Sequence, residues 1–277
     1  MIASVVVPAH NEAAGLSGNL TALLDGIPRG AVDVVVVCNG CTDDTAAVAR
    51  TVPGVRVLEI AEASKARAVE VGNLAAHTFP RLHLDADVRL TGTDLLRLVD
   101  ALDEDGVLAV APERTIPLAA SSWPVRAYYR VWQALPNVRS GLFGRGAFCL
   151  TAVGQARVAA AGNGLMNDDL VASELFTPAE RRVVAEATVV VRPPRTVKDL
   201  VRRRIRVATG NAQADDHGAR NGSTSLSDLL ALGLRQPSIG LRVPVFMTVT
   251  LVARMLSRRA VRTGDYTTWL RDESSRA

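Results

Sequence analysis

The sequence is poor in aromatic residues and lacks the glycine-rich loops with which many enzymes hold nucleotides. Phe, Trp and Tyr make up only 4% of the 277 residues, so side chains on which nucleic-acid bases could stack are scarce. Neither G-x-G-x-x-G nor G-x-x-x-x-G-K-[ST] occurs anywhere in the chain. These absences argue against a nucleic-acid-binding protein, a dinucleotide-dependent dehydrogenase and a P-loop NTPase.

Cysteine is rare, and its spacing does not complete a metal site. Cys38 and Cys41 have the C-x2-C spacing of zinc and redox sites, but no second Cys or His pair supplies four ligands. With Cys149 the number is odd, and the start "MIASVVVPAH" has no basic end or cleavable apolar region. We therefore expect no zinc and a protein of the reducing cytoplasm.

Long apolar runs are missing as well. Residues 243–256 form the longest one near the end, which is shorter than the roughly 20 residues of a spanning helix, and Arg254 interrupts it. Two interpretations stay open: a buried helix, or a helix that lies on a membrane with its arginines toward anionic headgroups.

Negative charge is scarce in the last third of the chain. Residues 181–277 hold 18 Lys and Arg against 8 Asp and Glu, a balance of +10, although the whole chain carries only +4. Such an excess favours an anionic partner, either a phosphorylated substrate or the cytoplasmic face of a membrane.

The first 110 residues alternate β-rich runs with helix-forming segments of about 10 to 20 residues. This order predicts a parallel sheet with helices on its faces, and runs that are apolar on both sides fit buried parallel strands. The predicted strands are "SVVVPA", "VDVVVVCN", "VRVLEI" and "RLHLDAD". Each ends in polar residues, and ligands bind at the carboxyl edge of such sheets, so we expect a site built from four strand ends.

Two aspartates one residue apart, Asp85 and Asp87, close the fourth of these strands. Oxygen ligands in this arrangement suit Mg2+ or Mn2+, which keep their other positions for water and substrate phosphates. Lys65 and Arg67 fall on the same edge and would neutralise phosphate charge. The pattern predicts a metal and a diphosphate.

The pattern loosens after residue 110. We expect a helix in "SSWPVRAYYRVWQAL", a glycine-punctuated loop entering a strand in "GLFGRGAFCLT", and a helix opened by Asn167, Asp168 and Asp169. A strand in "RRVVAEATVVVRPP", a basic helix in "KDLVRRRIRVATGNAQ" and a mobile loop in "ADDHGARNGSTS" follow.

Five segments in this order resemble glycosyltransferase family 2: "VVVPAHNE", "NGCTDDT", "SKARAVEVGN", "LDAD" and "NDDL". The resemblance implies the GT-A fold, an α/β fold with a mixed, mostly parallel central sheet, helices on both faces and a Rossmann-like nucleotide-binding half. It implies a GT-A domain over residues 1–215, with a donor-binding half (1–110) and an acceptor half (111–215). Residues 216–277 would form a mobile loop and a helical C-terminal extension.

The resemblance also implies roles for individual residues. Asp169 would be the general base, with Asp168 beside it as the family's acidic pair; helix capping is the alternative for both. Asn39 stands where the family usually has Asp, and Arg203 and Arg206 would contact acceptor or diphosphate. Asp87 and Asp85 would hold the metal, and His217 could join them. The expected donor-binding residues are Pro8, Ala9, Asn11, Glu12, Asn39, Lys65, Arg67, Asp85 and Ala86.

The resulting expectation is a metal-dependent glycosyltransferase. It would move one sugar from a nucleotide-sugar, UDP-linked, to a hydroxyl of an envelope or lipid-linked acceptor, with inversion, using Mn2+ or Mg2+. It would be cytoplasmic or peripheral on the inner face of the plasma membrane, and would bind no nucleic acid. The alternatives are a retaining transferase acting on a small anionic acceptor such as phosphoglycerate, a sugar-1-phosphate nucleotidyltransferase, and a catalytically silent binding protein of the same fold.

Overall fold

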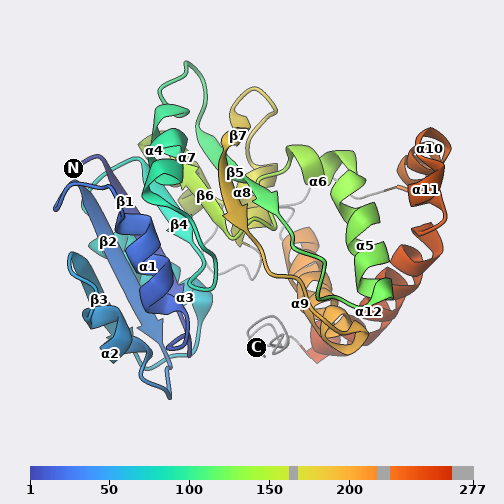
Figure 1. Cartoon of the computed structure of the whole chain (residues 1–277), viewed down its shortest axis with the longest axis horizontal. Helices are drawn as coiled ribbons and strands as arrows, with labels where there is room; N and C mark the ends of the chain where they lie inside the picture. The colour runs from blue at the N-terminus through green and yellow to red at the C-terminus, as the bar shows by residue number, and fades with distance from the viewer. Residues whose placement is uncertain (162–167, 217–224, 264–277) are drawn as a thin grey trace. The chain divides into compact units, whose positions relative to one another are not determined.

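The structure is a computed structural model that describes residues 1–161, 168–216 and 225–263 (Figure 1). The chain divides into two compact units. Unit 1 comprises residues 1–115 and 142–191, and unit 2 comprises residues 116–141 and 192–277.

Unit 1 is built on a mixed sheet. Its strands are β1 (Ala3–Ala9), β2 (Val32–Asn39), β3 (Val55–Ile60), β4 (Arg81–Leu84), β5 (Ala109–Thr115), β6 (Ala147–Leu150) and β7 (Arg181–Val190). Its helices are α1 (Leu16–Leu24), α2 (Thr45–Arg50), α3 (Lys65–Ala75), α4 (Gly92–Asp100), α7 (Ala152–Ala160) and α8 (Asp168–Glu174). The four strands expected in the first 110 residues are confirmed, although β4 ends at Leu84, one residue before the first aspartate of the pair.

Within the described residues the sheet has seven strands in the order β3-β2-β1-β4-β6-β5-β7. Strands β1 to β4 are mutually parallel where they pair, β6 is antiparallel to β4 and β5, and β7 is parallel to β5. Because crossovers in such sheets are right-handed, α1 and α2 lie on one face and α3, which carries the chain back past β1, lies on the other (Figure 1). The strand order reverses at β1, because β2 and β3 lie on one side of it and β4 lies on the other, and ligands of open α/β sheets bind at such a point.

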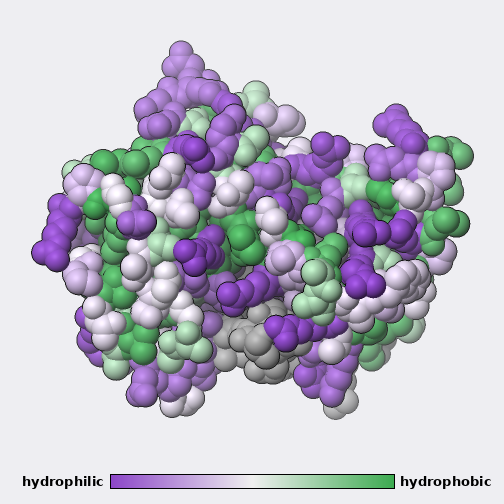
Figure 2. Space-filling view, in the orientation of Figure 1, coloured by the Kyte–Doolittle hydropathy of each residue, from purple (hydrophilic) through white to green (hydrophobic). Residues whose placement is uncertain are grey.

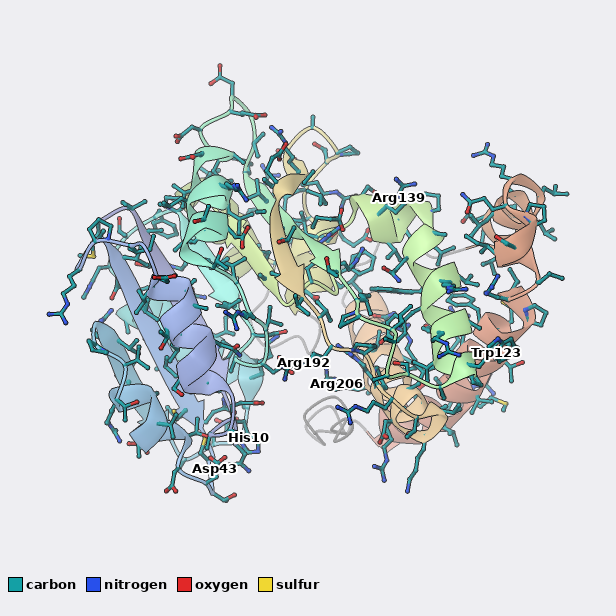
Figure 3. The ribbon with its side chains drawn as sticks, in the orientation of Figure 1. His10, Asp43, Trp123, Arg139, Arg192 and Arg206 are labelled. Atoms are coloured by element: carbon teal, nitrogen blue, oxygen red, sulfur yellow. The ribbon has the colours of Figure 1, made fainter. Side chains whose placement is uncertain are left out.

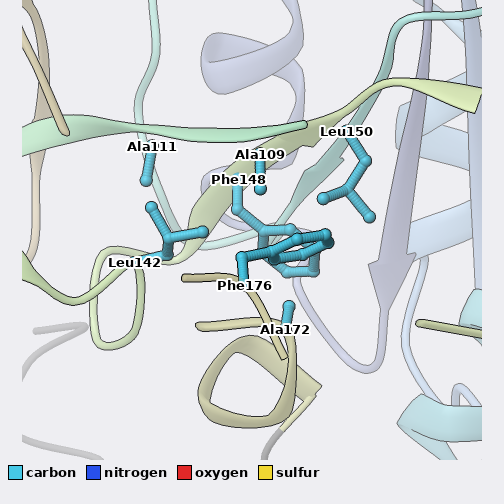
Figure 4. Packing of buried hydrophobic residues seen from close by; sticks show 7 residues of the cluster. All are labelled: Ala109, Ala111, Leu142, Phe148, Leu150, Ala172 and Phe176. Carbon is cyan, nitrogen blue, oxygen red and sulfur yellow. The ribbon is translucent and has the colours of Figure 1, made fainter. Parts of the chain in front are cut away.

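The buried apolar residues explain why this sheet forms. Every residue of β1 and β2 is buried, as expected for strands covered on both sides. Figure 4 shows a second cluster, in which α8 packs on β5 and β6. Its buried members are Ala109, Ala111, Leu142, Phe148, Leu150, Ala172 and Phe176.

An ion pair holds the chain together near the start of β2, away from the carboxyl ends of the strands. Asp33, 7% exposed, accepts hydrogen bonds from Nε and Nη2 of Arg56, both at 2.9 Å, and from the His77 N–H at 3.0 Å. Burial would raise the pKa of Asp33, but these hydrogen bonds and the charge of Arg56 outweigh it and lower the pKa.

Unit 2 is helical in its described part. Its helices are α5 (Trp123–Ala134), α6 (Pro136–Ser140), α9 (Val197–Asp216), α10 (Leu226–Arg235), α11 (Pro237–Gly240) and α12 (Val243–Thr263). Helix α12 packs on α9 and α5, where the rings of Phe246 and Tyr128 stack with centroids 5.0 Å apart. The helices expected at 121–135 and 198–213 are confirmed. Residues 214–216, expected in a loop, are instead the last turn of α9, since Ala and Gln before them favour helix.

Candidate functional site

The loops after β1 and β2 are tied together by reciprocal hydrogen bonds. Asn11 accepts from the Thr42 N–H at 2.7 Å through Oδ1 and donates from Nδ2 to Thr42 Oγ1 at 3.1 Å. This places Asn11 at φ +53°, the left-handed region that Asn tolerates better than most residues. Cys41 lies in the same junction, 3.4 Å from the Asn11 nitrogen that donates to its Sγ. These hydrogen bonds hold the two loops, residues 10–13 and 40–45, to each other, and we call the pair of loops the rigid wall.

Asp43 strengthens this wall. Its carboxylate accepts from the Ala13 N–H at 3.3 Å and from the Thr45 N–H at 3.1 Å, and Thr45 Oγ1 accepts from the Glu12 N–H at 2.7 Å. Burial would raise the pKa of Asp43, yet the bonds from Thr45 and Ala13 lower it. Figure 3 shows His10 and Asp43 at the same end of unit 1, beside the ends of β1 and β2.

The residue at position 39 is turned into the sheet. Asn39 is 4% exposed, and its Nδ2 donates to the Ala9 carbonyl at 2.9 Å. Its own carbonyl oxygen lies 2.5 Å from His10 Nδ1. Ala9 is itself buried, as is Pro8. Among Pro8, Ala9, His10 and Asn39, only His10 is therefore half-buried, and the other three are buried. The side-chain amide of Asn39 is hydrogen-bonded to the main chain.

A cation and a carboxylate expected on the same sheet edge meet in the structure. Lys65 Nζ lies 2.8 Å from Asp85 Oδ1, with side chains 23% and 38% exposed. Lys65 begins α3, which Ser64 caps by accepting from the Arg67 N–H at 3.2 Å. Gly72 lets this helix approach β1, because a Cβ there would lie 2.4 Å from Val6. The close packing of α3 thus brings Lys65 to Asp85.

Arg67, the second cation expected at this edge of the sheet, forms an ion pair within α3. Arg67 Nη1 pairs with Glu70 at 2.6 Å, and their side chains are 48% and 38% exposed. An exposed pair of this kind contributes little to stability and leaves the guanidinium accessible.

The two aspartates sit in a tight turn after β4. The Asp85 N–H donates to the Gly146 carbonyl at 2.8 Å, and the Asp85 carbonyl accepts from the Val88 N–H at 3.0 Å. The carbonyl of the intervening Ala86 accepts from Asn19 Nδ2 at 2.9 Å. Asp87 is exposed.

The turn that carries Asp85 and Asp87 suits a hard divalent cation whose remaining ligands come from substrate and solvent. No group of three or more His, Cys, Asp or Glu side chains that could enclose a metal occurs among the residues the structure describes. Asp85 and Asp87 would hold Mg2+ or Mn2+ through carboxylate oxygens, and phosphate and water would complete its shell. Cys38 and Cys41 belong to no such group.

A glycine loop between α6 and β6 connects this turn with the expected general base. The Gly144 N–H donates to Asp169 Oδ2 at 2.6 Å, while Gly146, two residues on, accepts from Asp85. Both glycines have positive φ, +67° and +65°. The other carboxylate oxygen of Asp169, Oδ1, accepts from the Leu170 N–H at 2.8 Å. The side chain of Asp168 lies outside the described part of the chain.

Two buried arginines support the same loop. Arg114, 7% exposed, donates to the Phe143 carbonyl at 2.8 Å, and Arg145, fully buried, donates to the Pro112 carbonyl and to Glu113 Oε1, both at 2.9 Å. Burial lowers the pKa of Arg114 and the charge of Arg145 adds to this, while Glu113 and Asp169 oppose it. The loop is therefore anchored from beneath by charged groups close to Asp169.

The motifs did not identify these supporting residues. Gly144, Gly146 and Arg114 carry no recognised motif, and the one available signal was the G-x-G spacing in "FGRGAF". Two glycines alternating with a charged residue before a strand are typical of a loop that needs left-handed backbone.

The remaining expected residues belong to unit 2 or lie outside the described chain. Arg203 Nη1 donates to the Arg192 carbonyl at 3.0 Å. Figure 3 shows Arg206 on α9. His217 lies outside the described residues.

The sequence is similar to a known protein family and to several curated proteins. The family described as Glycosyl transferase family 2 matches residues 4–145. Uncharacterized glycosyltransferases of Mycobacterium bovis and Mycobacterium tuberculosis are 37% identical over 121 residues, which is 44% of this chain and 52% of theirs. The match thus spans about half the length of these curated relatives.

Solved structures share the architecture. The mannosyltransferase PcManGT from Pyrobaculum calidifontis, in complex with GDP-Man and Mn2+, has a TM-score of 0.64 at 20% identity, over 95% of this chain and 79% of that one. Glucosyl-3-phosphoglycerate synthase from Mycobacterium tuberculosis, with Mn2+, UDP-glucose and phosphoglyceric acid, has a TM-score of 0.55 at 18% identity, over 81% and 82%. Similarity at such identities shows the fold alone, which is the expected GT-A fold.

Proposed function

The chain belongs to glycosyltransferase family 2, and from this premise we propose that it transfers one sugar from a UDP-sugar to an acceptor hydroxyl with Mn2+ or Mg2+. The observation that carries the proposal is the meeting of Lys65 with Asp85 at 2.8 Å, beside the point where the strand order of the sheet reverses. A cation beside two carboxylates suits a metal-bound diphosphate, since the carboxylates would hold the metal, and the metal and the Lys65 ammonium group would balance the charge of the leaving nucleotide.

The donor would be held by the rigid wall and the turn after β4. The loops at Asn11 and Thr42 are preorganised, so nucleotide binding would cost little ordering of the protein. The proposed donor-binding set remains Pro8, Ala9, Asn11, Glu12, Asn39, Lys65, Arg67, Asp85 and Ala86. Of these, buried Asn39 would act by shaping the loop more than by direct contact with the base.

The metal, when bound at Asp85 and Asp87, would act as a Lewis acid on the diphosphate. Asp169 would accept the proton of the acceptor hydroxyl, as the general base of an inverting transfer. The hydrogen bonds from Gly144 and Leu170 orient its carboxylate. Asp168, Arg203, Arg206 and His217 remain proposals for roles near acceptor, diphosphate or metal.

The acceptor we propose is an envelope precursor or lipid-linked molecule at the inner face of the plasma membrane. The support is the basic balance of +10 over residues 181–277. The second candidate is a retaining transfer to a small anionic acceptor, supported by similarity to the phosphoglycerate-bound synthase and by the arginines of α9.

Calorimetry with UDP, UDP-glucose, GDP and GDP-mannose, with and without Mn2+, tests the donor half of the proposal. Tight UDP binding that needs both Mn2+ and Asp87, shown by its loss in Asp87→Ala, is the expected result. Tighter binding of GDP would overturn the base assignment alone. If no nucleotide binds in a metal-dependent manner, a silent binding protein of this fold becomes the better explanation. The anomeric configuration of the product, read by NMR, separates inversion from retention.

A further inference from the structure

Helix α12 buries one side and exposes an apolar one. Phe246, Val249, Ala253 and Ser257 are 2–6% exposed and recur at helical spacing, so they form the side that packs on α5 and α9. Leu251 and Met255 lie on the opposite side and are 50% and 58% exposed. A helix that only served the core of unit 2 would carry polar residues there.

The helices before α12 expose apolar side chains too. In α10, Leu229 and Leu232 are buried, whereas Leu230 and Leu234 are 69% and 84% exposed. The α10–α11 pair is tight, because a Cβ at Gly240 would lie 3.1 Å from the Cα of Gly233. Leu241, directly after α11, is 82% exposed. Figure 2 shows hydrophobic residues in green along the outer edge of α10 and α11. We call Leu230, Leu234, Leu241, Leu251, Met255 and Leu256 the exposed apolar face.

From residue 229 to residue 264, the stretch that carries this face, every charged side chain is basic. Residues 229–264 contain six arginines and neither Asp nor Glu. Arg235, Arg254 and Arg258 are exposed, and Arg258 follows Met255 by three residues on the same side of α12. Asp228, two residues before Leu230, is an exposed acidic residue of α10, but beyond it, as far as residue 264, the only charged residues among the apolar ones are arginines. Such a stretch complements a surface that is apolar in its interior and anionic at its boundary with water.

The apolar segment is longer than the run 243–256, so the expectation that it is too short to span a membrane is wrong on length alone. Residues Pro237–Arg258 are long and apolar enough to cross a bilayer, and 17% of the residues in the apolar window are buried. Two features favour a helix that lies on the surface. Residues 237–240 form the separate helix α11, and the buried side of α12 is committed to α5 and α9. A span would strip that side of its partners and place Arg254 in the hydrocarbon.

We propose that the exposed apolar face is a docking surface for anionic phospholipid bilayers, on which α10 and α12 lie with their leucines in the headgroup region. The choice of the inner leaflet rests on the proposed function, but the surface itself does not. Leu234 and Leu241 are its most exposed members and would insert first, while Arg254 and Arg258 would contact lipid phosphates.

Flotation of the full-length protein with phosphatidylcholine vesicles, with and without phosphatidylglycerol, tests this. The wild-type protein should float with the anionic vesicles and much less with the neutral ones. Leu234→Glu with Leu241→Glu should reduce the partition coefficient by about tenfold or more. The matched control is Leu74→Glu, on α3 in unit 1, where the leucine is 80% exposed; it should change partitioning less than about twofold.

Two double charge reversals separate the electrostatic contribution to membrane binding from the apolar one. Arg254→Glu with Arg258→Glu should reduce binding about tenfold or more, whereas Arg29→Glu with Arg50→Glu, the same change of charge on exposed residues of unit 1, should have little effect. Equal losses in both pairs would mean non-specific attraction and would overturn the proposal, as would wild-type protein that stays in the soluble fraction.

Two further outcomes would overturn it in favour of other occupants. If membrane-bound protein resists alkaline carbonate extraction, the segment spans the bilayer. If Leu234→Glu with Leu241→Glu turns a dimer into a monomer and vesicles bind neither, a second copy covers the face. Metal-dependent nucleotide binding is measured on the same samples, so failure of the surface is distinguished from failure of the enzymatic proposal.

Discussion

The main-chain N–H of Gly144 donates a 2.6 Å hydrogen bond to Asp169 Oδ2, and two residues later the carbonyl of Gly146 accepts from the N–H of Asp85. One five-residue loop, residues 142–146, therefore contacts both the expected general base and the expected metal-binding turn. Because the loop is also held by buried arginines, a change in it should be felt at both places.

Asp169→Asn should remove the proton acceptor while keeping a side chain of the same shape. We expect kcat to fall by about a thousandfold with metal-dependent nucleotide affinity unchanged, since general base catalysis contributes about 10²–10⁴. Initial rates and calorimetry on the same variant measure the two effects. Asp105→Asn, at an exposed position, is the matched control and should behave like wild type. An unchanged kcat in Asp169→Asn would rule out Asp169 as the general base.

Arg114→Lys should loosen the glycine loop without preventing the donor from binding. Nη1 of Arg114 reaches the carbonyls of Phe143 and Gly144 at 2.8 and 3.4 Å, and the shorter lysine side chain would hold its ammonium group farther from them, so Asp169 would be less well oriented. We expect kcat to fall about 10–100-fold while KM for the donor changes less than about threefold. A purely structural arginine would instead lower the melting temperature and the amount of active enzyme, with kcat per active site unchanged.

Gly146→Ala should weaken metal binding. A Cβ there would lie 2.4 Å from Val88 Cγ2 and 3.2 Å from Asp85 Oδ2, in a backbone with φ +65°. We expect a loss of about 1–3 kcal/mol of stability and a lower affinity for Mn2+ with nucleotide. Gly54→Ala shares the positive φ, +87°, but its Cβ would meet nothing within 4 Å, so it isolates the backbone strain. Equal effects of both changes on Mn2+ affinity would exclude a contact between Gly146 and the turn.

Asp33→Asn should destabilise unit 1 in a pH-dependent manner. The side chain is 5% exposed, but that of Arg56 is 39% exposed, so we expect about 2–3 kcal/mol, below the cost of breaking a fully buried pair. The pKa of Asp33 is lowered from 3.8, so its stabilisation is present above that pH and is lost as the pH falls through the native pKa. Urea unfolding of wild type and variant should therefore differ at neutral pH and converge in acid. Asp103→Asn, an exposed position, should show no such convergence.

Thiol reactivity offers a test of the donor site. Cys38 and Cys149 are 2% and 0% exposed, and burial raises the pKa of each to about 12, so neither should react at neutral pH in the native state. Cys41 is partly exposed and lies in the wall formed by the first two loops. A disulfide reagent should therefore modify Cys41 alone, and UDP with Mn2+ should slow this reaction several-fold. Modification at the same rate with and without nucleotide would place the donor elsewhere.

The alternation of strands and helices predicted β1 to β4 well, because buried parallel strands such as β1 and β2 are apolar on both sides and cannot be confused with surface strands. The meeting of Lys65 with Asp85 followed from the rule that parallel strands end at one edge. The inward turn of Asn39 did not follow, since its hydrogen bond to Ala9 depends on the register of β1 and β2.

The glycine loop before β6 is confirmed, but its contacts could not be predicted, for a related reason. Its contacts join residues 25 to 61 positions apart, and spacing along the chain does not encode such distances. Residues 214–216 belong to α9 and not to the expected loop, because composition marks a polar segment but not the residue at which a helix ends.

Unit 2 is assembled from two stretches of chain separated by residues 142–191, and this has a consequence for synthesis. Helix α5 leaves the ribosome before β6 and β7 exist, yet the ring of Tyr128 stacks on Phe246, which is made more than a hundred residues later. The nascent chain therefore carries an uncovered aromatic surface until α12 has been synthesised. Expression fragments that stop near residue 191 would keep that surface exposed, and extending them through α12 should improve their yield of soluble protein.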